Sequence, residues 1–305
     1  MEIFYGLDNI NYSKKVVTLG NFDGVHLGHK ELISKAVSLG KEKNLLSYVV
    51  SFYPHPRSFF NEDLKYINTL EEKHKNIKAI GADALVILEF NEGIASLSRE
   101  SFVKEILYKK LNAQIVVVGF DFLFGKNREG NAENLAESAS EYGIEVYVTP
   151  PVEVDGLKVS SSLIRECYTT GEVEKAKKFL GYYPKISGEV ISGKQLGRNI
   201  GFPTANINYD KEQLLPGKGV YGVKICIKEK EYAGIANVGV KPTVKKDDLV
   251  EVEVHVIDFL DDIYGENVSV SFLGKIRDEM KFSSLEELKN QIDNDVKTAI
   301  KKYCL

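Results

Sequence analysis

Short apolar runs alternate with helical patterns along the first 180 residues. Five runs are rich in β-branched residues and nearly continuous in apolar character, which is typical of strands covered on both faces; they lie at 16–20, 45–53, 84–90, 114–120 and 144–150. Helical segments are predicted at 28–40, 70–80, 98–111, 131–142, 160–170 and 172–180. Regular alternation of strand and helix predicts an α/β domain with a parallel sheet and helices on both of its faces.

The pattern changes near residue 183, where strand-like segments begin to dominate. In VEVEVHV at 250–256 the valines share one face, and the glutamates and the histidine share the other. Such alternation is typical of antiparallel sheets and small barrels. A helix is predicted at 284–302 after the cap-like Ser283 and Ser284. We therefore predict an α/β domain at 1–182 and an antiparallel β-barrel domain at 183–305 that ends in a helix.

Size and charge narrow the class of protein. A chain of 305 residues favours two domains. The net charge of −4, with both signs interleaved, gives no basic surface for nucleic acid or an anionic membrane. No apolar run reaches membrane-spanning length, and the N-terminus lacks the pattern of a signal peptide. The three cysteines are widely spaced, which indicates reduced thiols. We expect a cytoplasmic monomer or weak homo-oligomer that binds small molecules.

The stretch GNFDGVHLGH at 20–29 directly follows the first predicted strand. In an open parallel sheet, ligands bind at the carboxyl ends of the strands, near helix N-termini. Glycines here let the backbone approach a phosphate. His26 and His29 are three residues apart at the start of a helix, so their imidazoles can converge on one ligand and stabilise charge during displacement at phosphorus. A metal pair or two surface histidines are the alternatives.

This stretch resembles the signature of the nucleotidyltransferase superfamily that includes the cytidylyltransferases and FAD synthetases. VSSSLIR at 159–165 is similar to a second element of that superfamily, and SFYPHP (51–56) and GFDFLFGKNREGN (119–131) resemble elements of bacterial FAD synthetases. The resemblance implies a Rossmann-like domain in which His26 and His29 are catalytic. It implies nucleotide contacts from Gly20, Asn21, Phe22, Asp23, Gly28, Ser160, Ser161, Ser162 and Arg165, and flavin contacts from Pro54, His55, Pro56, Asp121, Phe122 and Phe124.

The second half carries GKQLGRNIGFPTANI at 193–207. Thr204 and Asn206 offer neutral oxygens suited to a Mg²⁺ ion that keeps its waters and the ATP phosphates. The stretch resembles the riboflavin kinase signature, and 232–244, 252–259 and 276–282 resemble further kinase elements in order. The resemblance implies nucleotide contacts from Gly193, Lys194, Arg198, Gly201 and Phe202, and flavin contacts from Arg277, Glu279 and Phe282. It makes Glu253 the general base, whereas the alternation alone favours a solvated glutamate.

The resemblance covers nearly all of the chain and identifies it as similar to the bifunctional bacterial riboflavin kinase/FAD synthetase family. It implies phosphorylation of riboflavin to FMN and adenylylation of FMN to FAD, with ATP, Mg²⁺ and flavins as small-molecule partners. Three alternatives stay open: a single-activity enzyme with one half reduced to a binding module, a cytidylyltransferase-like enzyme with an unrelated β domain, and a flavin-binding protein without catalysis.

Overall fold

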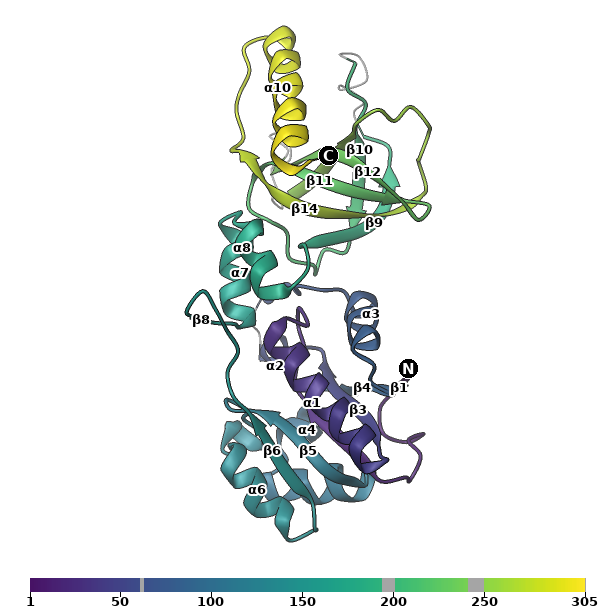
Figure 1. Cartoon of the computed structure of the whole chain (residues 1–305), viewed down its shortest axis with the longest axis vertical. Coiled ribbons are helices and arrows are strands. Elements are labelled where there is room, and N and C mark those ends of the chain that lie inside the picture. Colours follow the sequence, from purple (N-terminus) through teal and green to yellow (C-terminus); the bar gives the residue numbers. More distant parts are fainter. Residues whose placement is uncertain (61–62, 194–200, 241–249, 305) are drawn as a thin grey trace. The chain divides into compact units, whose positions relative to one another are not determined.

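The structure is a computed structural model that describes residues 1–60, 63–193, 201–240 and 250–304 (Figure 1). The chain divides into two compact units, Met1–Ser160 and Ser161–Leu305. Each unit has its own hydrophobic core, so each is described by itself. Of the residues named above, Lys194 and Arg198 lie outside the described ranges.

The first unit is built on a six-stranded parallel sheet in the order β1-β4-β3-β2-β5-β6. Its strands are β1 (Glu2–Tyr5), β2 (Lys15–Leu19), β3 (Leu46–Tyr53), β4 (Ala84–Glu89), β5 (Ala113–Gly119) and β6 (Glu145–Thr149). Its helices are α1 (Leu27–Lys43), α2 (Pro56–Phe59), α3 (Leu70–Ile80), α4 (Glu92–Ala95), α5 (Arg99–Ser101), the π-helix η1 (Phe102–Lys110), the 3₁₀ turn η2 (Lys126–Arg128) and α6 (Ala132–Ser140). A short hairpin of β7 (Glu153–Val154) and β8 (Leu157–Lys158) follows.

Both faces of this sheet are buried, as the continuous apolar runs predicted. Val16 packs in a cluster that includes Ile33 of α1 and Ile77 of α3. The next residue, Val17, points to the other face, where it joins a cluster with Leu107 of η1 and residues of α6. Alternate side chains of one strand therefore serve two separate helical layers. The helix predicted at 98–111 differs in detail, because it starts as the single turn α5 and continues as a π-helix.

The second unit contains a closed antiparallel barrel in the order β10-β13-β12-β11-β14-β9. Its strands are β9 (Lys185–Ile191), β10 (Ala205–Tyr209), β11 (Gly219–Ile227), β12 (Lys230–Val240), β13 (Val250–Val256) and β14 (Asn267–Arg277). Val252, Val254 and Val256 lie in the barrel core, so the alternate residues of β13 face outward. The terminal helix α10 (Leu285–Tyr303) packs on β11, β12 and β14 (Figure 1). The predicted α/β and β-barrel architecture is confirmed.

The helices α7 (Ser161–Thr169) and α8 (Val173–Leu180) belong to the second unit. Val173 at the start of α8 is part of the barrel core, and α8 contacts β14. The helices meet at Gly171, where φ is +78° and an added Cβ would lie 2.7 Å from the Tyr221 hydroxyl. Packing therefore joins this helix pair to the barrel, while the functional boundary at 182/183 stays a prediction.

Candidate active sites

The turn between β2 and α1 is tightly folded at the carboxyl edge of the parallel sheet. Phe22, Gly24 and Val25 all have positive φ, at 48°, 84° and 35°. Such angles are rare for a bulky or β-branched residue and indicate strain that the surrounding packing holds in place. The Phe22 ring is fully buried and folds back over Gly20, where an added Cβ would lie 3.0 Å from it. The turn thus fixes the backbone on which the two histidines are mounted.

His26 and His29 lie face to face at the start of α1. Their ring centroids are 3.6 Å apart with an interplanar angle of 15°, and Phe22 meets the His29 ring edge-on at 5.3 Å. His26 caps the helix, because its Nδ1 accepts a hydrogen bond from the His29 backbone N–H at 3.3 Å. An accepting Nδ1 leaves the Nε2 of a neutral His26 as its donor. The structure therefore brings the two imidazoles together.

The environment of His29 keeps its imidazole neutral. Burial lowers the pKa of His29 well below its usual value of 6.5, and the nearby His26 and Lys73 lower it further. The residue keeps part of its surface accessible, but its Nδ1 is buried and has no hydrogen-bond partner among the described residues. Buried polar atoms in proteins are normally hydrogen-bonded, so an unpaired ring nitrogen here is consistent with a hydrogen bond to a bound ligand. His29 can therefore donate a hydrogen bond to a phosphate without adding charge.

Lys73 on α3 is hydrogen-bonded to the turn between β2 and α1. The sequence did not predict this residue as part of the site. The side chain is 4% exposed, and its Nζ donates to the Asn21 carbonyl at 2.9 Å and to the Ser51 hydroxyl at 3.2 Å. Burial lowers the pKa of Lys73 to about 8, and Asp23 opposes this shift. Asp23 is itself buried and accepts a hydrogen bond from the Ile67 backbone N–H at 3.0 Å.

The carboxyl ends of β3 and β4 carry an aromatic cluster. Phe90 is its centre: the rings of Phe52, Phe59 and Phe60 pack against it with centroids 5.4 to 6.1 Å away. Phe60 is 63% exposed, so part of the cluster is open to a ligand. The predicted flavin residues Pro54, His55 and Pro56 belong to the same segment, which ends β3 and starts α2. His55 is buried and caps α2 through its Nδ1, which accepts from the Arg57 N–H at 3.1 Å.

A second aromatic group follows β5 at the same edge of the sheet. The rings of Phe122 and Phe124 stack with centroids 5.7 Å apart. Phe124 forms a backbone bridge with Gly130, where an added Cβ would lie 2.6 Å from the Phe124 ring. Asp121, the third predicted flavin residue here, is mostly exposed and pairs with Lys158 at 3.0 Å. Only a residue without a side chain fits beneath Phe124, so Gly130 closes this loop.

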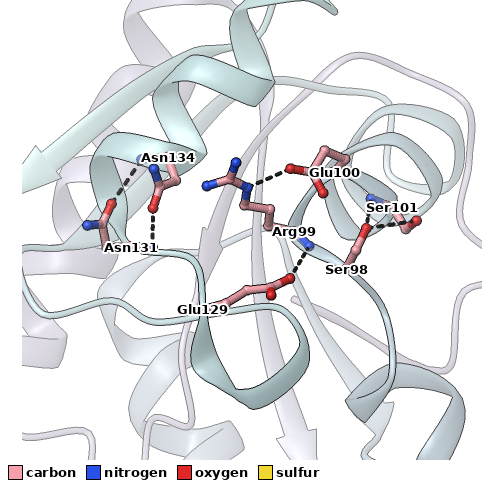
Figure 2. Close-up of polar contacts among 7 residues, drawn as sticks. All are labelled: Ser98, Arg99, Glu100, Ser101, Glu129, Asn131 and Asn134. Atoms are coloured by element: carbon pink, nitrogen blue, oxygen red, sulfur yellow. Dashed lines mark hydrogen bonds and ion pairs between the residues drawn. The ribbon is translucent and has the colours of Figure 1, made fainter.

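The loop that carries these aromatics is anchored to α5 by a hydrogen bond, because the Arg99 backbone N–H donates to the Glu129 carboxylate at 3.4 Å (Figure 2). Within α5 itself, the Arg99 Nε donates to Glu100 at 2.5 Å. The loop ends at α6, where Asn131 and Asn134 form a reciprocal cap (Figure 2). Both ends of the loop are therefore fixed while its aromatic part stays at the sheet edge.

The remaining predicted nucleotide residues of this site fall on both sides of the division between the units. Gly28 lies in α1 beneath His26, and an added Cβ would be 3.2 Å from the His26 ring. Ser160 ends the first unit, whereas Ser161, Ser162 and Arg165 lie in α7 of the second unit. Their approach to the histidine pair stays a prediction.

The kinase residues form a row across the outer face of the barrel. Asn206 on β10 is directly opposite Glu253 on β13, and Glu253 is directly opposite Asn237 on β12. Residues directly opposite in antiparallel strands project from the same face, with Cβ atoms about 5 Å apart. Because Val252 and Val254 point into the core, this face is the outer one. The register thus brings Asn206 to Glu253 and adds Asn237, which sequence reasoning missed.

The segment before β10 lies close to this row. An added Cβ at Gly193 would lie 2.1 Å from the amide nitrogen of Asn206, so the backbone crosses directly over that side chain. Phe202 meets the His255 ring edge-on at 5.1 Å, and the His255 Nδ1 is 2.9 Å from the Pro203 carbonyl. These contacts attach the segment to β13. Gly201 has φ of +90°, with nothing within 4 Å of an added Cβ.

Thr204 lies at a pocket of about 300 Å³. Its lining is mainly apolar and ends in an acidic turn with Asp261 and Asp262; the other lining residues are Val190, Pro203, Ala205, Val254, Val256, Phe259, Leu260, Ile263 and Tyr264. Neutral side-chain oxygens at the mouth of a pocket suit Mg²⁺, which binds few protein ligands and keeps several waters. The described residues contain no cluster of three or more His, Cys, Asp or Glu that could hold a metal.

The three predicted flavin residues, of which Arg277 ends β14 and the other two follow it, contact other residues of the second unit. The Arg277 guanidinium binds the buried Asp295 of α10 through three contacts of 2.8 to 3.0 Å, and its Cζ is 5.8 Å from the Phe282 ring centroid. A Glu279 carboxylate oxygen covers Gly239, where an added Cβ would be 2.0 Å from it. Arg277 therefore fastens the terminal helix to the barrel, a role that the sequence did not predict.

Known proteins resemble the chain along its whole length. The FAD synthetase family matches residues 8–163, and the riboflavin kinase family matches residues 180–303. The protein named bifunctional riboflavin kinase/FMN adenylyltransferase from Buchnera aphidicola (subsp. Schizaphis graminum) is 40% identical over 99% of both chains. Its namesake from Bacillus subtilis is 37% identical over 95% of this chain and 93% of its own.

The chain belongs to the bifunctional riboflavin kinase/FMN adenylyltransferase family. A crystal structure of this fold, described as a macrolide-efflux protein from Streptococcus pneumoniae, is 34% identical with a TM-score of 0.91 and covers 98% of this chain and 99% of its own. In the part of the chain that the structure describes, no helix has the length and apolar character needed to cross a bilayer. Family membership thus rests on the matched sequences and on a shared fold.

Proposed function

We propose that this protein makes FMN from riboflavin and then FAD from FMN, using ATP in both steps. The observation that carries the proposal is the match over 99% of both chains with a relative named for both activities. The geometry supports it, because each half contains a polar constellation suited to one of the two phosphorus transfers. It argues against the single-activity alternative, since neither half has lost its motif residues.

In the first reaction the barrel unit would transfer the γ-phosphoryl group of ATP to riboflavin. The Glu253 carboxylate takes the proton from the ribityl 5′-hydroxyl while the new O–P bond forms and ADP leaves. Asn206 and Asn237 flank Glu253 in the cross-strand row and orient it. The pocket at Thr204 receives the nucleoside part of ATP, because its lining is largely apolar.

Thr204 and Asn206 would hold Mg²⁺ in this site, with water and ATP oxygens as the other ligands. The ion would neutralise charge on the β- and γ-phosphates during transfer. Lys194 and Arg198 are proposed to bind the phosphates, and Gly193, Gly201 and Phe202 to shape the segment around them. Arg277, Glu279 and Phe282 are proposed to border the flavin, with Arg277 using the N–H groups that Asp295 and the Asp278 carbonyl do not take.

In the second reaction a phosphate oxygen of FMN would attack the α-phosphorus of a second ATP. The new P–O bond forms as the bond to the β-phosphate breaks, and pyrophosphate leaves. His26 and His29 donate hydrogen bonds to the oxygens that gain charge in the transition state. Ser160, Ser161, Ser162 and Arg165 are proposed to steady the leaving pyrophosphate.

The flavin in this reaction would lie against the aromatic groups at the carboxyl edge of the sheet. Phe60 and Phe90 after β3 and β4, and Phe122 and Phe124 after β5, offer ring surfaces for an isoalloxazine. Offset stacking of aromatic rings contributes about 1 kcal/mol beyond buried area. We further propose that the functional domains meet at 182/183 and that a cytoplasmic monomer or weak homo-oligomer acts without nucleic acid or membrane partners. The interleaved charges, which sum to −4, support the exclusion of nucleic acid.

Two substitutions in the full-length protein test the division of labour. H29A is expected to lower FAD formation from FMN by roughly 100-fold while FMN formation persists. E253Q is expected to lower FMN formation by roughly 100-fold or more while FAD still forms from supplied FMN. Chromatography of the flavins after incubation with MgATP measures both steps.

E251Q is the matched control for E253Q, because Glu251 shares its strand and face but is opposite Gly239. It should leave both activities near the wild-type level. If H29A or E253Q abolished both steps in a folded protein, the assignment of one reaction to each unit would be wrong.

A further inference from the structure

Within the described residues, the buried ammonium of Lys73 has neutral hydrogen-bond partners. Its two acceptors among the described residues are the Asn21 carbonyl and the Ser51 hydroxyl. Ser51 in turn donates to the same Asn21 carbonyl at 3.0 Å. The three groups form a closed triangle that joins α3, the end of β3 and the turn before α1. Burying a charged group without a directly bonded counter-ion disfavours folding, so a protein that keeps one there gains something else from it.

The charged and titratable groups that act on Lys73, or on which Lys73 acts, belong to the first site. Asp23 in the turn is the nearby carboxylate that raises the pKa of Lys73, against the larger effect of burial. On α1, the positive charge of Lys73 adds to the lowering of the His29 pKa, and the His26 ring stacks on the His29 ring. On α3 itself, the buried Glu72 is bonded instead to the Thr69 N–H at 3.2 Å and the Asn68 amide at 3.3 Å.

We infer that Lys73 is a positioning residue of the proposed adenylyltransferase site: its ammonium fastens the strained turn before α1 to β3 through the Asn21 carbonyl and the Ser51 hydroxyl. This inference rests on the proposed second reaction. Asn21 comes directly before Phe22, whose positive φ needs support from its surroundings. A misplacement of about 1 Å in such a turn is enough to lower a rate about 100-fold.

One consequence separates this role from simple packing. Because the pKa of Lys73 is about 8, the ammonium loses its proton in mildly alkaline solution, when other lysines remain charged. A neutral Lys73 holds the Asn21 carbonyl and the Ser51 hydroxyl more weakly than the ammonium does, so the turn that carries His26 and His29 is less firmly fixed. FAD formation should therefore fall above pH 8, while FMN formation in the same protein should not follow that curve.

The test compares K73M, K73R and the wild-type full-length protein. Both activities are measured separately from pH 6.5 to 9.5 with saturating MgATP. K73M should lower kcat for FAD formation by roughly 10- to 100-fold at pH 7, and its rate should no longer show the alkaline decline. K73R keeps its charge throughout this range, so its activity should hold at pH 9 relative to pH 7. FMN formation should stay within about twofold of wild type in both variants.

K75M is the matched control on the same helix. Lys75 pairs with Glu71 at 2.7 Å on the surface, where the two side chains are 65% and 74% exposed. This variant should keep the wild-type pH profile. Thermal unfolding adds a second readout: K73M should unfold at the wild-type temperature or above, because its buried charge is gone, whereas a purely structural lysine would leave a less stable protein.

An alkaline decline that persists unchanged in K73M, or a K73M protein that makes FAD at the wild-type rate, overturns the inference. Parallel loss of both activities with a lower unfolding temperature overturns it as well. A wild-type protein that makes no FAD at any pH contradicts the proposed function instead, so the two failures are distinguishable.

Discussion

The Arg277–Asp295 pair predicts that one carboxylate fastens the terminal helix to the barrel. Asp295 is 2% exposed, and besides the guanidinium its Oδ1 accepts from the Gln291 amide at 2.9 Å. The substitution D295A removes every one of these bonds and leaves Arg277, whose side chain is 17% exposed, without its counter-ion. Breaking a buried pair from one side costs about 3–5 kcal/mol.

Partial exposure of Arg277 places the expected loss at the lower end, about 3 kcal/mol, because water can rehydrate part of the guanidinium. For a unit of this size, 1 kcal/mol corresponds to about 3–4 °C in the unfolding temperature. D295A should therefore lower the unfolding temperature of the second unit by roughly 10 °C. Calorimetry of the full-length protein measures this, with the riboflavin-dependent activity followed over the same temperatures.

Two controls define the result. K297A truncates an exposed side chain of the same helix and should change stability by less than about 0.5 kcal/mol. The double substitution R277M/D295L removes both charges and should recover at least half of the loss, because an apolar pair of similar volume tolerates burial. If D295A cost less than about 1 kcal/mol, the idea that this pair holds α10 in place would be refuted.

Other consequences are open to direct measurement. G193A would put a methyl group 2.1 Å from the Asn206 amide, so FMN formation should drop about 10-fold or more while FAD formation from FMN is unchanged; a kinase rate within twofold of wild type would contradict this. The pKa of Lys73 is about 8 in the folded protein against its usual 10.5, so the unfolded chain binds the proton more tightly and the resulting destabilisation is fully present below pH 8. It should be relieved by roughly 3 kcal/mol as pH rises to 10.5. Urea unfolding of wild type and K73M at pH 7 and pH 10 checks it, since only the wild type should gain this amount.

Local patterns were sufficient to predict most of the fold. Continuous apolar runs identified the buried parallel strands, and strict alternation identified β13. The short hairpin of β7 and β8 was not predicted, and one strand of the parallel sheet and one strand of the barrel also escaped, each for its own reason. Glu2–Tyr5 is short and largely exposed, so β1 lacks an apolar signal, and its pairing with β4 is a tertiary contact. No strand is predicted at Ala205–Tyr209, because the polar motif residues of this segment hide the alternation of β10.

In the candidate sites, too, local geometry could be predicted from the sequence, whereas contacts between distant segments could not. The spacing of His26 and His29 on a helix was enough to expect them to meet, because helix geometry is local. Glu251 and Glu253 share a face, so alternation cannot separate them; only the register sets Glu253 between Asn206 and Asn237. Lys73 did leave a trace in the sequence, since it occupies the same helical stripe as Leu70 and Ile77. The partner of Arg277 left none, because it is 18 residues away on another element.

Closure of the barrel has a consequence for how ligand binding can be observed. Every strand is paired along both edges, so the backbone amides of β10, β12 and β13 are already protected from solvent exchange in the free protein. A substrate that settles on the outer row can add little to that protection. Its arrival would register instead in signals from the carboxylate and amide side chains, which makes isotope labelling of Glu and Asn a better reporter than deuterium uptake of the main chain.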